Sequence, residues 1–274
     1  MFDDDFLQHV EEVARAGAEP LLRHWRRLEP GQVTEKARND LVSDADRAAE
    51  AAILAEIARR FPDHRVLSEE SGWSRQPGGG PTWLVDPLDG TTNYVHGFPH
   101  FAVSIGVAVD GRVEAAVVLD PIKGDVFRAA RGHGAWWNGS PCRVSGQSSL
   151  EGALLTTGFP FRAIGLLDPY LAIFRDAFRR CGGIRRPGSA ALDLAHTACG
   201  IFDGFFEFEL QPWDVAAGSL LVEEAGGVVT DMDGGGDFLR SGGVLCGPEG
   251  VHRELLEIVK RQRSWWLGSR VDPR

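Results

Sequence analysis

The chain has 274 residues, of which 43% are hydrophobic and 25% are charged. This length exceeds the ~100–200 residues of a typical domain, so it allows one large domain or two closely joined ones. The composition excludes a mini-protein held together by metals or disulfides, and it excludes disorder over most of the chain.

The formal net charge of −10 argues against a nucleic-acid partner, because proteins that bind nucleic-acid phosphates carry a basic face. A small molecule is the expected partner. If that molecule carries a phosphate, the acidic protein needs bound cations between itself and the phosphate.

Three features bear on the location of the protein and on its cysteines. The longest apolar run, Phe101–Val109, is far shorter than the ~20 residues that cross a bilayer. The acidic start Met1–Asp5 is unlike a signal peptide, so we expect a cytoplasmic protein without a membrane partner. The cysteines are widely separated and predict buried small side chains, not zinc ligands or disulfides. They are Cys142, Cys181, Cys199 and Cys246.

The first half of the chain predicts two helices followed by a mostly antiparallel sheet. Apolar residues at spacings of three and four predict a helix over Asp3–Arg27, and a second helix follows Ser43 and ends at Arg60. Residues 76–81, which include three consecutive glycines, predict a mobile loop or lid. Short apolar runs bounded by turn residues predict the strands, with a hairpin at Asp110-Gly111. These runs are Arg65–Ser68, Thr82–Asp86, Phe101–Val109, Arg112–Leu119 and Asp125–Ala130.

After Gly139 the pattern changes to alternating strands and helices, which predicts layers of helix and sheet. We therefore expect an N-terminal subdomain over 1–139, a C-terminal subdomain over 140–264 and a loose tail over 265–274. Strands are predicted at Ala153–Thr157, at Phe202–Phe208, and near Val228 and Val244. Helices are predicted at Asp168–Arg180, Ser189–Cys199, Val215–Ala225 and Pro248–Arg261.

The segment from Asp86 to Thr91 carries the strongest chemical signal. Pro87 restricts the conformation of Asp86 and fixes its own φ, so the chain turns directly after an apolar strand. Such a turn brings Asp86, Asp89 and the Leu88 carbonyl toward one point, and oxygen ligands of this kind suit magnesium. The amides of Gly90 and Thr91 begin a helical turn, where an anion is favoured. Metal and phosphate sites are therefore expected side by side.

Each acidic segment also has a purely structural interpretation when it is taken alone. Asp-Pro-Leu-Asp-Gly is a usual tight-turn composition, and Glu69-Glu70 after a short strand fits a solvated turn. If Glu69 faces the site, its neighbour Glu70 should point the other way. Asp214 and Asp46 both stand where they can cap a helix. Three histidines without partners at metal-ligand spacing are expected to be structural or on the surface: His96, His100 and His196.

Taken together and in this order, the segments resemble the inositol monophosphatase family over roughly Asp3 to Lys260. The combination is far more specific than any single piece. The segments that carry the resemblance are Ser68–Ser71, Trp83–Pro99, Gly188–Leu194, Pro212–Gly218 and Glu224–Gly227.

The resemblance implies an α+β fold, a layered α-β-α-β-α sandwich, and commonly a homodimer. It also implies two or three Mg²⁺ ions, with Glu69, Asp86 and the Leu88 carbonyl on the first and Asp86, Asp89 and Asp214 on the second. A third, weaker ion would sit near Glu69.

The resemblance further implies roles around the substrate. Thr91, with Asp46 behind it, would orient the attacking water, and the amides of Gly90 and Thr91 would bind the phosphate. Lys36 falls where a basic residue near the phosphate is common. The alcohol part of the substrate would contact Gly188, Ser189, Ala190 and Glu207.

The implied activity is magnesium-dependent hydrolysis of an inositol monophosphate. Related hydrolases of fructose 1,6-bisphosphate, other sugar phosphates, histidinol phosphate or nucleotide 3′-phosphates remain alternatives, as does a non-catalytic regulatory protein that has kept the fold. Glu209 departs from the neutral residue of many relatives, which bears on the substrate and leaves the metal ligands unaffected.

Overall fold

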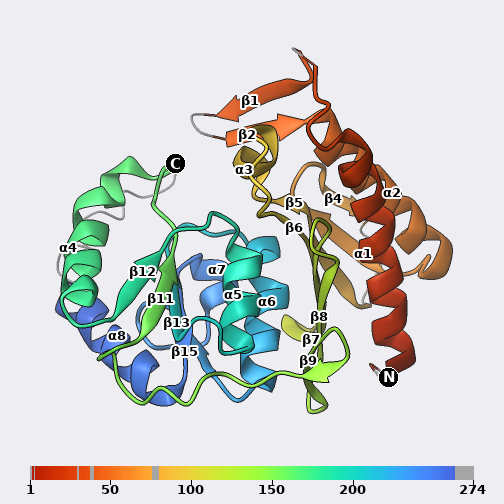
Figure 1. Ribbon diagram of the computed structural model, residues 1–274. Helices are drawn as coiled ribbons and strands as arrows, with labels where there is room; N and C mark the ends of the chain where they lie inside the picture. Colours follow the sequence, from red (N-terminus) through yellow and green to blue (C-terminus); the bar gives the residue numbers. More distant parts are fainter. Residues whose placement is uncertain (1, 3, 30, 38–39, 76–79, 263–274) are drawn as a thin grey trace.

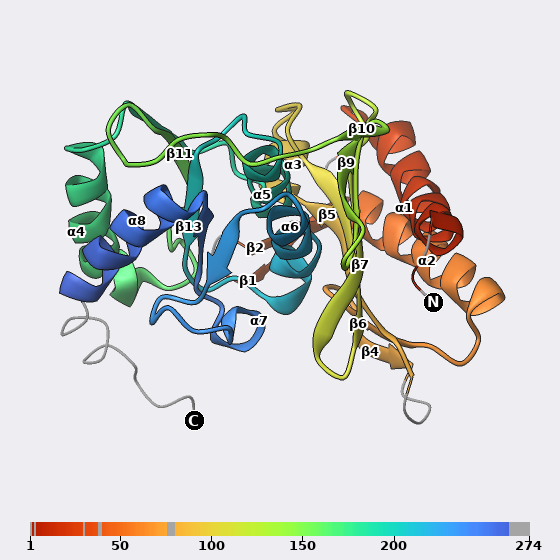
Figure 2. The same ribbon diagram turned by 90° about the horizontal axis from the view of Figure 1, so that it is seen from below.

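Five alternating layers of helix and sheet make up the chain (Figures 1 and 2). The structure is a computed structural model that describes residues 2, 4–29, 31–37, 40–75 and 80–262. Most of the predicted lid and the predicted tail over 265–274 lie outside the described residues. No helix in the described ranges is both long and apolar enough to cross a membrane.

Two helices, α1 (Asp4–His24) and α2 (Asp44–Arg60), form the first layer and cover one face of the larger sheet. Ser43 caps α2, and Asp46 accepts a hydrogen bond from the Ser43 amide at 2.9 Å. This reciprocal capping explains where α2 begins. Both helices were predicted, with ends that differ by no more than three residues.

The larger sheet has eight strands in the order β10-β9-β8-β7-β6-β5-β3-β4. All neighbouring strands are antiparallel except β3 and β5, so the prediction of a mostly antiparallel sheet is confirmed. The hairpin at Asp110-Gly111 is confirmed, with both residues at positive φ. The strands are β3 (Arg65–Ser68), β4 (Gly72–Arg75), β5 (Thr82–Asp89), β6 (Ala102–Val109), β7 (Arg112–Asp120), β8 (Asp125–Ala130), β9 (Gly134–Trp137) and β10 (Ser140–Pro141).

Strand β5 does not end at Asp86, so that prediction was wrong. The strand continues through Pro87 to Asp89, and its pairing with β6 shifts in register between Asp86 and Asp89. A bulge lets a strand accept a proline, which has no N–H to donate to the ladder. The irregular stretch still presents both aspartates to the same region.

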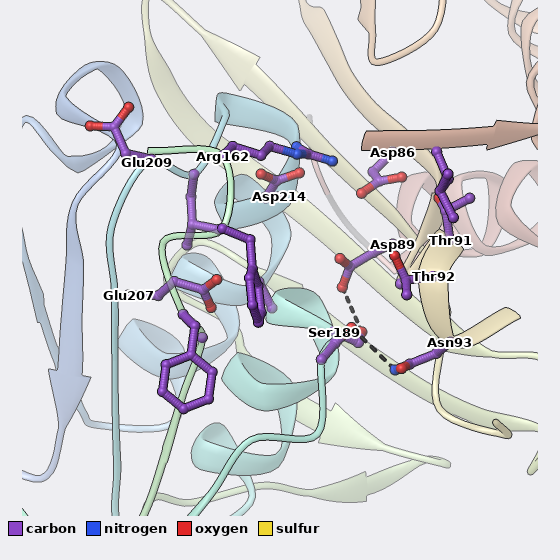
Figure 3. Close-up of a pocket in the computed structure, with 18 of the residues that line it drawn as sticks. Asp86, Asp89, Thr91, Thr92, Asn93, Arg162, Ser189, Glu207, Glu209 and Asp214 are labelled. Atoms are coloured by element: carbon purple, nitrogen blue, oxygen red, sulfur yellow. Dashed lines mark hydrogen bonds between the residues drawn. The ribbon is translucent and has the colours of Figure 1, made fainter. Parts of the chain in front are cut away.

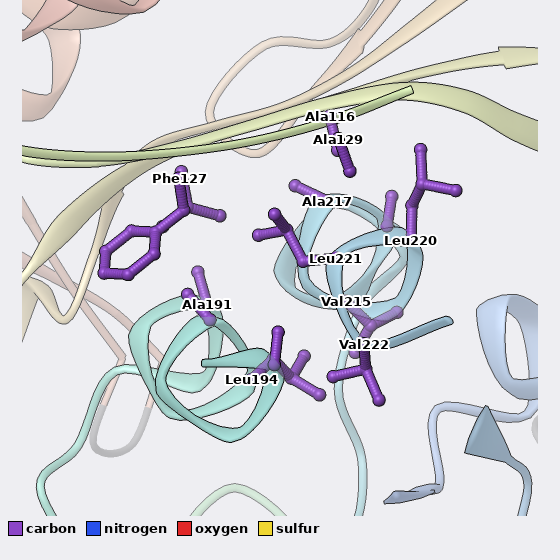
Figure 4. Close-up of a cluster of buried hydrophobic side chains, with 14 of the residues drawn as sticks. Ala116, Phe127, Ala129, Ala191, Leu194, Val215, Ala217, Leu220, Leu221 and Val222 are labelled. Carbon is purple, nitrogen blue, oxygen red and sulfur yellow. The ribbon is translucent and has the colours of Figure 1, made fainter. Parts of the chain in front are cut away.

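The third layer consists of α5 (Ala190–Ala198) and α6 (Pro212–Glu224), which lie between the two sheets (Figures 2 and 4). Their side chains share one apolar cluster with both sheets, so the two halves of the chain have a continuous core. Residues labelled in Figure 4 that belong to this cluster include Phe127 and Ala129 from the larger sheet and Leu194, Leu220 and Leu221 from the helices.

The smaller sheet has the order β12-β11-β13-β15-β14, and α4 and α8 cover its outer face. Strand β11 is parallel to both of its neighbours, whereas β15 is antiparallel to both of its own. The elements are β11 (Leu154–Thr157), α4 (Leu167–Phe178), β12 (Gly183–Arg185), β13 (Gly204–Glu207), β14 (Val228–Thr230), α7 (Phe238–Ser241), β15 (Val244–Gly247) and α8 (Glu249–Arg261). The expected α-β-α-β-α sandwich is confirmed; the division after residue 139 stays a prediction.

A separate hairpin, β1 (Val33–Ala37) and β2 (Asp40–Ser43), was not predicted. It projects next to the short helix α3 (Thr91–Val95), which follows the β5 bulge (Figure 1). Four of the five residues of β1 are exposed, so it lacks the apolar alternation by which a strand is recognised. Cys142 and Cys246 are buried as expected, whereas Cys181 and Cys199 are partly exposed; all four are free thiols.

Candidate active site

A pocket of about 530 Å³ opens where the β5 bulge, α3, the start of α5 and the start of α6 meet (Figure 3). Most residues singled out in the sequence line it, although they come from segments as far apart in the chain as those of Glu69 and Asp214. The lining residues that were predicted are Glu69, Asp86, Leu88, Asp89, Gly90, Thr91, Gly188, Ser189, Ala190, Glu207 and Asp214.

The two aspartates of β5 are held by backbone amides. Asp86 is 2% exposed, and its Oδ1 accepts a hydrogen bond from the Leu88 amide at 2.9 Å. Asp89 Oδ2 accepts from the Ser189 hydroxyl at 2.5 Å and from the Ala191 amide at 2.8 Å. Since Ser189 caps α5, the Asp89 carboxylate lies at the positive end of a helix, where a negative charge is stabilised.

Asp214 reaches the pocket from the first turn of α6. Pro212 occupies the first turn of the helix, and Asp214 Oδ2 accepts a hydrogen bond from the Gln211 amide at 2.7 Å. Asp214 therefore does cap α6, as the purely structural interpretation of this residue predicted. It uses one carboxylate oxygen, and the residue still lines the pocket.

These carboxylates destabilise one another's charged forms. Burial raises the pKa of Asp86 well above its usual range, and the negative charges of Glu69, Asp89 and Asp214 raise it further. Burial and the Glu69 charge also raise the pKa of Asp89 and Asp214. Like charges about 4 Å apart repel by ~4 kcal/mol at an effective dielectric constant of 20. The pocket thus concentrates negative charge.

Lys36 of β1 lies at the edge of this charge and contacts both glutamates. Its Nζ is 3.3 Å from Glu69 Oε1 and 2.8 Å from Glu70 Oε1. Of the two glutamates only Glu69 lines the pocket, as expected of neighbours that point different ways, and the long Lys36 side chain reaches both. Although burial lowers the pKa of Lys36, the Glu69 charge and the Glu70 contacts raise it overall, so the side chain stays cationic.

Thr91 and Asp46 are hydrogen-bonded, as the resemblance implied. Thr91 Oγ1 lies 3.0 Å from Asp46 Oδ1 and 3.1 Å from the Leu88 carbonyl oxygen. A hydroxyl has one proton, so it donates to one of these acceptors at a time and keeps its lone pairs free. Burial raises the pKa of Asp46 to about 6, and hydrogen bonds from Ser43 and Thr91 oppose that shift.

The donor set suits a hard divalent cation. Carboxylate and carbonyl oxygens are the ligands that Mg²⁺ prefers, and buried carboxylates with mutually raised pKa values gain most from a cation. Within the described residues, no three acidic, histidine or cysteine side chains already stand in the arrangement of a metal cluster. The carboxylates therefore line the same pocket and repel one another, and binding of an ion would draw their oxygens together.

Glu207 is partly buried in the opposite wall of the pocket. Burial, followed by the charge of Asp193, raises its pKa to about 8. A Cβ atom on Gly158 would lie 1.8 Å from Glu207 Oε1, so only glycine leaves room for this carboxylate. Glu209, the departure noted in the sequence, has φ of 60° and points away from Asp89 and Asp214 (Figure 3).

Two arginines and several aromatic side chains of the lining were not predicted from the sequence. Arg162 donates to Asp40 at 2.7 Å, which joins the loop after β11 to the β1–β2 hairpin. Arg186 lies over the ring of Phe161, 5.1 Å from its centroid. The Gly-Phe-Pro-Phe-Arg run directly after a predicted strand is the signal that could have indicated this wall.

Known proteins resemble the chain over nearly its whole length. The model of the inositol monophosphatase family matches residues 3–264. The Nus factor SuhB of Pseudomonas aeruginosa is 49% identical over 252 residues, which are 90% of this chain and 93% of that protein.

Solved structures agree with the sequence matches. The extragenic suppressor protein SuhB from Bartonella henselae has a TM-score of 0.91 and 40% identity, covering 94% of this chain and 99% of its own. The inositol monophosphatase from Anabaena has a TM-score of 0.84 and 39% identity, covering 94% and 96%. The chain therefore belongs to the inositol monophosphatase family.

Proposed function

We propose that the protein is a magnesium-dependent phosphatase that hydrolyses inositol monophosphate to inositol and phosphate. The observation that carries the proposal is the set of four carboxylates that line one pocket: Glu69, Asp86, Asp89 and Asp214. Family membership supports the phosphatase reaction, and the geometry supports metal assistance.

Glu69, Asp86 and the Leu88 carbonyl would hold one Mg²⁺, and Asp86, Asp89 and Asp214 a second. A third ion would sit near Glu69. When bound, such ions neutralise the carboxylates, lower the pKa of water and stabilise the departing oxygen. The donor set described above fits this role, because all of these side chains supply oxygen.

Thr91 and Asp46 orient the attacking water. Because the Thr91 proton is directed at Asp46 or Leu88, the hydroxyl oxygen has lone pairs free to accept a hydrogen bond from the attacking water. The water oxygen then bonds to phosphorus while the bond from phosphorus to the alcohol oxygen breaks. The attacking water gives up one proton and the departing alcohol oxygen takes up one, so the products are the free alcohol and phosphate. Phosphate monoesters react through a loose transition state, so positioning and charge supply most of the catalysis.

The remaining pocket residues would bind the two parts of the substrate. The amides of Gly90 and Thr91 are proposed to bind the phosphate, with the Lys36 ammonium nearby. On the opposite side the alcohol would meet Glu207 and the segment Gly188–Ala190. Glu207 with a pKa of about 8 carries a proton at neutral pH, so it can donate a hydrogen bond to a hydroxyl group as well as accept one.

Other hydrolases of the same kind remain within the proposal. Fructose 1,6-bisphosphate, histidinol phosphate and nucleotide 3′-phosphates present the same phosphate to the same acidic wall. A panel of these esters and inositol 1-phosphate, assayed for phosphate release with magnesium or with a chelator, tests the proposal. We expect magnesium-dependent release, fastest from the inositol ester, whereas no release from any ester would contradict it.

A second candidate function comes from the names of relatives. The proteins that are 49% and 43% identical to this chain are named Nus factor SuhB. A regulatory role without turnover would not need the acidic ligands or the Thr91 hydroxyl. Their presence therefore favours an enzyme. The net charge of −10 still predicts no direct nucleic-acid contact. Homodimer formation and a cytoplasmic location also stay predictions.

A further inference from the structure

A buried polar cluster lies beside the pocket, and the mechanism proposed above gives its members no direct contact with the ions or the substrate. His100, just before β6, and Asp193, near the start of α5, bring Nε2 and Oδ1 to 3.7 Å from each other. Their side chains are 11% and 2% exposed. The Thr156 hydroxyl of β11 lies beside the same carboxylate. Segments from both halves of the chain therefore meet at this cluster.

Each of these three side chains has one buried polar atom without a hydrogen-bond partner among the described residues. The atoms are His100 Nε2, Asp193 Oδ1 and Thr156 Oγ1. Buried polar groups in native proteins are nearly always paired, so three such atoms together require an explanation. An N–H···O hydrogen bond spans about 2.7–3.2 Å, so a closure of roughly 0.5–1 Å lets His100 donate to Asp193.

His100 and Asp193 are both hydrogen-bonded to residues that line the pocket. The side-chain amide of Asn93 in α3 donates to the His100 carbonyl oxygen at 2.7 Å. The Asp193 amide donates to the Ser189 carbonyl at 2.9 Å, in the first turn of α5. Ser189 in turn donates its hydroxyl to Asp89 at 2.5 Å. A shift of Asp193 is therefore passed to Ser189, and from Ser189 to Asp89.

We propose that Asp193 is a positioning residue for the metal site. By accepting a hydrogen bond from His100, it fixes the start of α5 against the segment between β5 and β6, and so holds Asp89 in the orientation that binds a divalent cation. The inference rests on the proposed function, because it requires a cation at Asp89. Asp193 itself contacts neither the ion nor the substrate.

The test compares two replacements of similar size. Asp193→Leu removes the acceptor, whereas Asp193→Asn keeps an amide oxygen that still accepts from His100. The readout is the magnesium midpoint, the concentration of the ion that half-saturates the folded protein in a calorimetric titration. Loss of an outer-shell partner weakens metal binding by about 10–100-fold, and Asp193 acts one residue further out. We expect a rise of about tenfold for Asp193→Leu and of less than about threefold for Asp193→Asn.

Phosphate release provides the second readout. The Asp193→Leu protein should regain activity when the magnesium concentration is raised about tenfold, because its defect lies in holding the ion. His100→Phe should produce the same shift, and the double variant should be no worse than either single one, because both remove one hydrogen bond. If Asp193→Leu does not fold, His100→Phe carries the test alone.

His252→Phe is the matched control. His252 lies in α8, away from the pocket; it is also buried, and its Nε2 is 2.9 Å from the Thr230 hydroxyl. It should lower the melting temperature without moving the magnesium midpoint. An unchanged midpoint in Asp193→Leu and His100→Phe would overturn the inference, as would equal shifts in the Leu and Asn variants. If the wild-type protein itself does not respond to magnesium, the proposed function fails and the inference fails with it.

Discussion

Asp89 Oδ2 accepts a hydrogen bond from the Ser189 hydroxyl at 2.5 Å, across 100 positions of sequence. The contact joins the larger sheet to the helix layer and places a carboxylate at the start of α5. A carboxylate held in this way has one oxygen committed to the protein, and the other is available to a ligand. The pocket therefore depends on the packing of the two halves as much as on the acidic residues.

Asp89→Asn should nearly abolish phosphate release while the protein stays folded. The amide keeps the shape of the side chain but loses the charge that would hold the second ion. Loss of outer-shell partners already costs about 10–100-fold, so loss of a ligand should cost more than ~100-fold. Asp110→Asn, the same change in an exposed hairpin turn, should leave activity intact. Ordinary activity in Asp89→Asn would remove the second-ion assignment.

Thr91→Val should lower kcat by about 100-fold, because the attacking water loses the hydroxyl that orients it and misplaced reactants cost about that much. Valine has the shape of threonine without the hydroxyl that meets Asp46. Thr91→Ser, which restores the hydroxyl, should remain within about tenfold of the wild-type rate. Steady-state kinetics at saturating magnesium distinguish these variants, and equal rates for Val and Ser would show that the hydroxyl has no part in the reaction.

Gly158→Ala should raise KM and leave the magnesium response unchanged. The added Cβ would overlap Glu207 Oε1, so the carboxylate must move away from the proposed alcohol site. Gly146→Ala is the matched control, because a Cβ there meets no atom within 4 Å. A KM for inositol 1-phosphate that is the same in both variants would argue against substrate contact by Glu207.

Without divalent ions, the melting temperature should fall as the pH rises from about 6.5 to 8.5. Burial is the main cause that raises the pKa of Glu70 to about 7 and of Glu207 to about 8. Since the folded state then binds protons more tightly than the unfolded state, its stability decreases as the pH rises through these values. Below pH 6.5 buried histidines act in the opposite direction, because burial lowers the pKa of His196 to about 4.

Melting curves in a chelator across this pH range test the expectation, and Glu207→Gln should flatten part of the slope. Magnesium should raise the melting temperature most at the alkaline end, where the carboxylates are most charged. A melting temperature in chelator that stays level or rises from pH 6.5 to 8.5 would contradict the charge account.

The sequence predicted those parts of the fold that apolar periodicity marks. Strands Arg65–Ser68 and Asp125–Ala130 have the bounds that were expected, and α2 begins directly after its predicted cap at Ser43. The hairpin Val33–Ala37 with Asp40–Ser43 could not be found in this way. Its first strand faces solvent and has no buried face, so its sequence lacks the alternation of apolar and polar residues that marks a strand.

Residues within contiguous motifs were easier to predict than the walls of the pocket. Asp86 and Asp89 share one turn-like segment, so their convergence follows from local chemistry. Arg162 and Arg186 line the pocket because the helix layer holds the smaller sheet against the larger one. The Gly-Phe-Pro-Phe-Arg run marks the segment that carries Arg162, but no local pattern places it opposite the acidic residues. The 3.7 Å approach of His100 to Asp193 has the same origin.

The central claim is that the acidic pocket is a metal centre. Crystals soaked in Mn²⁺, a divalent ion that takes the same oxygen ligands, test it through the anomalous signal of manganese. The account predicts anomalous peaks among the oxygens of Glu69, Asp86, Asp89 and Asp214, and the loss of the peak between Asp89 and Asp214 in Asp89→Asn. A wild-type map without anomalous density in this pocket at millimolar Mn²⁺ would contradict it.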